Sequence, residues 1–71
     1  MSYERLVILA ADVKKGDRLF DAKSRDYYEV LTDAHECEGG VGFAAWHDST
    51  YESVALPYCD YCMVLRSSAA H

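Results

Sequence analysis

Residues 9–20 constrain the fold of this chain more than any other segment. Asp12 is a residue type that caps a helical turn by accepting backbone N–H groups. Gly16 can adopt the positive φ that ends such a turn, and a strand pattern resumes at Asp17. The segment therefore predicts the end of a strand, one short helical turn near Asp12–Gly16, and then a second strand. Asp12 is expected to cap the turn, and Val13 to fill the core beneath it. Such a corner determines structure and carries no chemistry of its own.

Short strand patterns recur along the chain, while helix patterns are nearly absent. The predicted strands cover residues 5–10, 17–22, 27–33, 41–47, 51–56 and 60–65. We expect Val54 and Leu56 to point inward, and Cys62 and Val64 to share one face, because side chains alternate along a strand. Five or six short strands at this spacing predict an all-β fold, a small antiparallel barrel. Residues 1–66 form its single domain and residues 67–71 a flexible tail.

The length of the chain limits the size of its core, and its composition bears on where in the cell the protein is located. Seventy-one residues suffice for one small core and not for two. No apolar run approaches the roughly 20 residues that span a bilayer, and the N-terminus does not resemble a signal peptide. Three cysteines, an odd number, fit a reducing compartment better than a disulfide framework. We expect a cytoplasmic protein without a membrane partner.

Charge is unevenly distributed along the chain. The net charge is −5, and the residues from Tyr27 onward include one basic side chain, Arg66, against seven acidic ones. An acidic surface of this kind opposes contact with a phosphate backbone. A local basic patch, interleaved with acidic residues, keeps a nucleic-acid-binding barrel open as an alternative. Its members are Lys14, Lys15, Arg18, Lys23 and Arg25.

Several motifs together resemble one family. They are the run Ala11-Asp12-Val13-Lys14-Lys15-Gly16-Asp17-Arg18-Leu19, then Tyr28-Glu29-Val30, and Asp60 before the last predicted strand. This pattern resembles the small Src-homology-3-like barrels that are common among short open reading frames of actinobacterial tailed phages and their hosts. The likeness covers nearly the whole chain. It implies the barrel, an aromatic groove for extended or Pro-rich peptides and, for a phage protein, the cytoplasm of the host cell.

The same opening is also similar to the first block of Hint domains, the self-splicing modules of inteins. Splicing needs a nucleophilic Cys or Ser at the cleavage junction and a domain about twice this length. No cysteine precedes Cys37 in this chain. We therefore do not expect splicing.

Four residues form the alternative of a zinc-stapled domain. His35 and Cys37, with Cys59 and Cys62, would supply the four N and S ligands of a structural zinc. In an extended segment, however, Cys59 and Cys62 point to opposite faces and cannot share a metal. We expect Cys62 to be a core side chain and Cys37 and Cys59 to be free thiols, with no cofactor.

No catalytic residues are predicted. His47, Asp48 and Ser49 adjoin in sequence, whereas the members of a catalytic triad converge from separate segments. Asp48 and Ser49 are typical turn formers between two strands. We therefore do not expect an enzyme.

Aromatic residues are the better indication of function. They outnumber what a core of this size needs, and aromatic side chains are typical anchors of protein interfaces. The sequence predicts a non-enzymatic protein-binding module, a phage accessory protein that contacts a host or phage protein with a basic or apolar surface. Self-association through an edge strand is one form of this prediction. The predicted partner-binding residues are Tyr27, Trp46, Tyr51, Tyr58 and Tyr61.

Overall fold

The computed structural model describes residues 2–67, which form an all-β domain with one 3-10 turn. The elements are β1 (Tyr3–Leu9), η1 (Ala10–Asp12), β2 (Arg18–Asp21), β3 (Asp26–Val30), β4 (His35–Cys37), β5 (Gly40–His47), β6 (Thr50–Leu56) and β7 (Tyr61–Ser67). The predicted fold class is thus confirmed. Within residues 2–67, no helix has the length and apolar character needed to cross a membrane.

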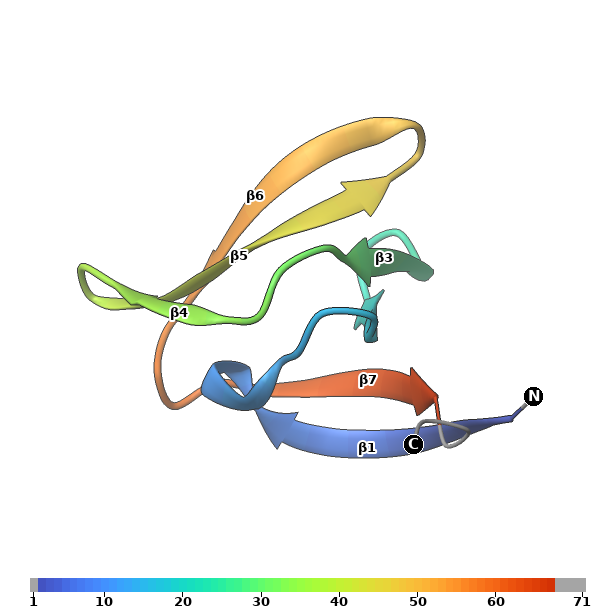
Figure 1. Cartoon of the computed structure of the whole chain (residues 1–71), viewed down its shortest axis with the longest axis horizontal. Coiled ribbons are helices and arrows are strands. Elements are labelled where there is room, and N and C mark those ends of the chain that lie inside the picture. The colour runs from blue at the N-terminus through green and yellow to red at the C-terminus, as the bar shows by residue number, and fades with distance from the viewer. Residues whose placement is uncertain (1, 68–71) are drawn as a thin grey trace.

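The strands form one antiparallel sheet that curls into a half-barrel (Figure 1). Its order is β1-β7-β2-β3-β5-β4, and β6 pairs with the other edge of β5. β1 pairs with β7 along its whole length, whereas β3 and β5 share only the pairs Glu29↔Trp46 and Val30↔Ala45. Among the described strands, β6 has no partner on its second edge. The half-barrel is therefore open between the β5–β6 hairpin and the lower layer of β1 and β7.

The core is thin and built from small side chains. Phe43 is its one buried aromatic residue, and half-buried side chains such as Val54 and Leu56 pack around it. Val13, Cys62 and Val64 are buried, so the inward positions predicted from strand alternation are confirmed. The buried apolar residues are Ala10, Val13, Leu19, Val30, Val41, Phe43, Ala45, Cys62 and Val64.

The corner after β1 depends on Asp17, not on Asp12. Gly16 has a φ of +94° and donates its N–H to the Val30 carbonyl at 2.9 Å, as its place in the turn predicts. The helical turn lies at Ala10–Asp12, before the predicted position near Asp12–Gly16. The predicted Asp12 cap is therefore wrong, because Asp12 ends the 3-10 turn and no side chain caps its start. Asp17 instead accepts the Lys14 N–H at 3.0 Å, from a site where it is 2% exposed.

Arg66 completes this corner from the far end of the chain. Its guanidinium donates to both oxygens of Asp17, from Nε at 2.9 Å and from Nη2 at 2.8 Å. Nη2 also donates to the Asp12 carbonyl at 3.1 Å. The hydrogen bond to Asp17 is the largest cause that raises the pKa of Arg66, and the negative charges of Asp17, Asp12 and Glu4 raise it further. The ion pair between half-buried Arg66 and buried Asp17 therefore ties β7 to the first corner.

One strand was not predicted, and several bounds differ from the prediction; the largest difference is at β3, which ends at Val30 and not at residue 33. The sequence pattern missed β4, because all its side chains are exposed and it has no apolar alternation. Ser67, predicted to begin the tail, is the last residue of β7. Residues 68–71, the rest of the predicted tail, lie outside the described residues.

Candidate functional site

A groove of about 540 Å³ lies on the open side of the half-barrel. β6 forms one wall, and β2 with the start of β7 forms the other. Its apolar side chains include Leu19, Val54 and Leu56, which also pack on the core. The full lining is Leu19, Phe20, Asp21, Ala22, Tyr28, Glu52, Ser53, Val54, Leu56, Tyr61, Cys62 and Met63.

The groove is acidic. Asp21 and Glu52 line it, and none of its lining residues is Lys or Arg. A hydrogen bond from the Ser24 hydroxyl, at 2.9 Å, lowers the pKa of Asp21 and keeps this carboxylate ionised. Burial raises the pKa of Tyr28, and the nearby charges of Glu52 and Asp21 raise it further. The groove thus presents an apolar floor beside negative charge.

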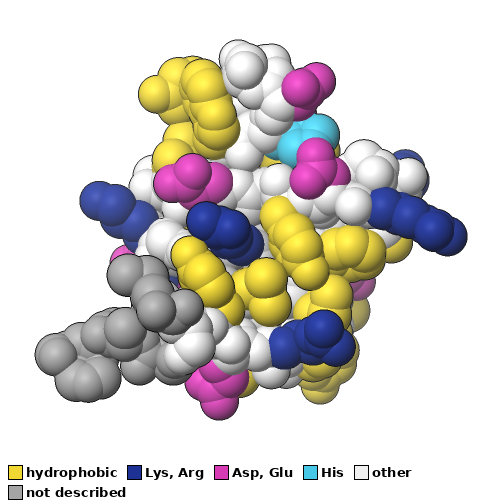
Figure 2. Space-filling model, turned by 90° about the vertical axis from the view of Figure 1, so that its right-hand side faces the viewer, with side chains coloured by type: hydrophobic (Ala, Val, Ile, Leu, Met, Phe, Trp, Pro, Cys, Tyr) yellow, Lys and Arg dark blue, Asp and Glu magenta, His cyan; other side chains and the backbone are white. Residues whose placement is uncertain are grey.

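His47 holds one wall of the groove in place. Its Nε2 lies 3.2 Å from Asp26 Oδ2 and its Nδ1 lies 3.7 Å from Glu52 Oε2. The imidazole also stacks on Tyr28, with 4.2 Å between centroids and 7° between planes. Figure 2 shows a histidine with acidic side chains beside it. Because β3 and β5 share few backbone pairs, this cluster helps to fix the β5–β6 hairpin over β3.

The residues after His47 form a tight turn, as predicted. Asp48 and Ser49 have φ values of +52° and +62°, the pattern of a two-residue type I′ hairpin. The acidic neighbours of His47 come from β3 and β6, not from Asp48. Sequence adjacency therefore gave no sign of its true partners.

Of the predicted aromatic residues, Trp46 and Tyr51 form a pair. They face each other across β5 and β6, with centroids 4.8 Å apart and planes at 80°. They are 38% and 73% exposed. The pair thus forms a rigid aromatic surface near the tip of the β5–β6 hairpin.

The other three predicted aromatic residues lie elsewhere. Tyr61 is 70% exposed and lines the groove. Tyr58 is exposed in the β6–β7 connection, and its pKa is raised by partial burial and by a hydrogen bond with Glu36. Tyr27 is half-buried against Phe20 on the neighbouring strand. The five residues therefore do not make one surface, and only Tyr61 belongs to the groove.

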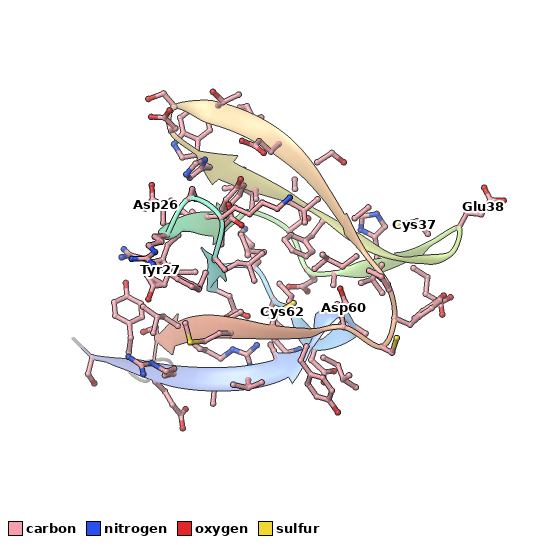
Figure 3. All side chains as sticks on the ribbon, turned by 180° about the vertical axis from the view of Figure 1, so that it is seen from behind. Asp26, Tyr27, Cys37, Glu38, Asp60 and Cys62 are labelled. Carbon is pink, nitrogen blue, oxygen red and sulfur yellow. The ribbon has the colours of Figure 1, made fainter. Side chains whose placement is uncertain are left out.

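The four candidate zinc ligands do not come together. His35 and Cys37 share a face over Gly42, where an added Cβ would lie 2.8 Å from Cys37 Sγ and 3.7 Å from His35 Nε2. Cys62, in contrast, is buried in the core. Figure 3 shows it well away from Cys37, which lies on the β4–β5 hairpin. Within residues 2–67, no cluster of three His, Cys, Asp or Glu side chains could hold a metal ion.

The cysteines should differ in reactivity. Cys37 and Cys59 are exposed, while Cys62 is 7% exposed and burial raises the pKa of its thiol. Because the thiolate is the reactive form, a colorimetric thiol reagent should modify two cysteines rapidly in the native protein and the third only after unfolding. Rapid reaction of all three thiols in the folded protein would contradict the burial of Cys62.

The basic residues of the predicted local patch are divided between two places. Lys14 and Lys15 lie in the corner before β2, and Lys23 and Arg25 lie in the turn after it. Arg18, between them on β2, lies over the Tyr3 ring with its Cζ 4.9 Å from the centroid. The two lysine-containing groups are therefore separated by the length of β2.

Most of the groove-lining residues were not predicted from the sequence. Asp21, Tyr28 and Glu52 come from three strands, and they meet only because the sheet curls. The alternation of side chains along the predicted strand 51–56 indicated part of one wall, since it predicted that Val54 and Leu56 face inward. Comparison with protein-family models, with curated proteins and with solved structures finds no match to this chain.

Proposed function

We propose that this chain is a small, non-enzymatic protein-binding module, an accessory protein of the kind that tailed phages encode, acting on a protein partner in the host cytoplasm. One observation carries the proposal: five of the nine aromatic side chains, Tyr3, Trp46, Tyr51, Tyr58 and Tyr61, are exposed. Tyr51 and Tyr61 are 73% and 70% exposed, while Phe43 is the only buried aromatic residue.

Exposed aromatic residues of this kind suit an interface physically. A tyrosine or tryptophan supplies a large contact area, loses little conformational entropy on binding and keeps a polar atom for a hydrogen bond. The Trp46–Tyr51 pair is already ordered by its edge-to-face contact. The negative net charge and the acidic groove favour a partner with a basic or apolar surface.

Self-association is a second form of the same function. β1 has no partner on its outer edge among the described strands, and Val7 in its middle is 68% exposed. Unpaired strand edges of this type are templates for pairing with another chain. Sedimentation equilibrium would show a concentration-dependent dimer if β1 pairs with its copy.

Affinity capture from host lysate, with bound proteins identified by mass spectrometry, tests the proposal. We expect a partner that the unaltered chain retains and that Trp46→Ala or Tyr61→Ala loses. An interface anchor is worth about 2 kcal/mol, so one of these changes should weaken binding by about 30-fold. Lys15→Ala, at an exposed position outside the aromatic surfaces, is the matched control and should keep full capture.

Circular dichroism must show that each variant remains folded. The proposal is contradicted if no protein binds specifically, or if capture survives removal of every exposed aromatic residue in turn.

A further inference from the structure

The free edge of β6 presents unpaired backbone groups. In a two-residue hairpin, the residues that close the turn, here His47 and Thr50, are hydrogen-bonded to each other, and bonded pairs alternate from there. Tyr51, Ser53 and Ala55 therefore direct their N–H and C=O groups away from β5. The backbone of Ala44, which lies opposite Ser53, follows the same alternation. Its carbonyl accepts the Leu31 N–H and its N–H donates to the Thr32 hydroxyl, so both groups point away from β6.

The start of β7 presents unpaired backbone groups on the opposite wall. β2 pairs with β7 only at Leu65 and Val64. The Ala10 N–H donates to the Asp60 carbonyl at 2.9 Å, and hydrogen-bonded pairs alternate along the β1–β7 ladder from there. The even-numbered residues of β7 therefore direct their N–H and C=O groups to β1, and the odd-numbered residues direct theirs to the other side. Tyr61 therefore directs its N–H and C=O toward the groove, and Met63 directs its N–H there; both residues line the groove.

An extended polypeptide segment fits this arrangement. A chain added to a strand edge gains main-chain hydrogen bonds, and its alternate side chains enter pockets on one face. The floor offers Leu19, Val54 and Leu56 to apolar side chains. Asp21 and Glu52 offer negative charge, and no basic lining residue opposes a cation.

We propose that the groove between β6 and β7 binds an extended segment of a partner protein, added as a strand along the free edge of β6. The alternate side chains of this segment that face the floor are apolar, except for a Lys or Arg at the end beside Glu52. The proposal rests on the proposed function and specifies the partner: its segment completes the open side of the half-barrel. Glu52 lies on the same face of β6 as Val54 and Leu56, and Asp21 lies on the same face of β2 as Leu19. The cationic side chain that reaches these carboxylates therefore lies on the same face of the segment as the apolar ones.

A direct test uses labelled peptides and fluorescence anisotropy with the full chain. We expect a short Val-Lys peptide, with Val at two alternate positions, Lys at the next alternate position and Thr between them, to bind. The same peptide with Glu in place of Lys should bind at least tenfold more weakly. A Val-Lys peptide N-methylated at every second residue should also lose about tenfold, because it cannot donate the strand hydrogen bonds. This peptide control probes the backbone bonds without altering the protein.

Two protein variants locate the site. Ser53→Pro removes an N–H that points into the groove and leaves the β5–β6 bonds intact, which an edge strand tolerates. It should weaken peptide binding about tenfold. Glu52→Gln should weaken it about fivefold by removing one charge, while Glu29→Gln, at an exposed position on β3 outside the groove lining, should not change it.

The outcomes separate this proposal from the proposed function. The strand-addition proposal is overturned if the Val-Lys peptide binds no better than its Glu counterpart, or if N-methylation and Ser53→Pro both leave binding unchanged. If a captured partner binds Ser53→Pro and Glu52→Gln as well as it binds the unaltered chain, the protein-binding function stands and the groove is not its site. If nothing is captured and no peptide binds, both are wrong.

Discussion

Replacing Arg66 with methionine should lower the free energy of unfolding of the protein by several kcal/mol. The change keeps the length of the side chain but leaves Asp17, 2% exposed, as a buried carboxylate without its partner. Removing one partner of such a pair lowers the free energy of unfolding by about 3–5 kcal/mol. A domain of this size has a free energy of unfolding of only about 4–10 kcal/mol. Urea denaturation, followed by circular dichroism, measures the loss.

A double-mutant cycle shows that the pair itself is responsible. Asp17→Asn removes the charge and keeps an oxygen that can accept the Lys14 N–H. Combined with Arg66→Met, it should be less destabilised than the sum of the two single changes, because no unpaired buried charge remains. Arg5→Met, at an exposed position on β1, is the control and should lose less than about 0.5 kcal/mol. A loss below about 1 kcal/mol for Arg66→Met would mean that the corner does not depend on the pair.

Gly40→Ala should be the most damaging glycine substitution in the β4–β5 hairpin. A Cβ at this position would overlap the Leu56 carbonyl oxygen and would lie 3.1 Å from the Leu56 carbonyl carbon and 3.3 Å from Pro57 Cα. All three atoms belong to the backbone, so no side chain can move aside. We expect a loss of about 3 kcal/mol or more in the free energy of unfolding.

The adjacent Gly39 is the matched control, because glycine is needed there for its backbone conformation and not for lack of space. It has a φ of +82°, and a Cβ there would meet no atom within 4 Å. Gly39→Ala should cost about 1–2 kcal/mol, and Gly39→Asn should cost less, since Asn adopts left-handed backbone more readily. At position 40 the order should reverse, because the larger Asn adds to the overlap. If Ala and Asn lower the free energy of unfolding equally at positions 39 and 40, the difference between a conformational role for Gly39 and a steric role for Gly40 is contradicted.

Local patterns predicted much of the fold. The alternation around Cys62 and Val64 placed both in the core, and the polar pair Asp48 and Ser49 predicted the turn. These features depend on neighbouring residues, so a single sequence contains them. β4 was missed because three exposed residues have no periodicity and are held by pairing with β5.

Long-range partners could not be predicted in the same way. Asp17 and Arg66 are 49 positions apart, and only the pairing of β2 with β7 brings them together. Asp12 was the more plausible cap from local sequence, yet Asp17 accepts the backbone bond. The groove raises the same difficulty, since its walls come from strands that do not pair with each other.

Amide hydrogen exchange, measured by NMR on the full chain with and without a captured partner, tests most directly whether the open side of the half-barrel is the binding surface. The amides of Ser53 and Ala55 on β6, and of Tyr61 and Met63 on β7, should exchange slowly only in the complex. They point into or along the groove and bond no described strand in the free protein. Unchanged exchange at these four amides, with protection gained elsewhere, would show that the partner binds another surface.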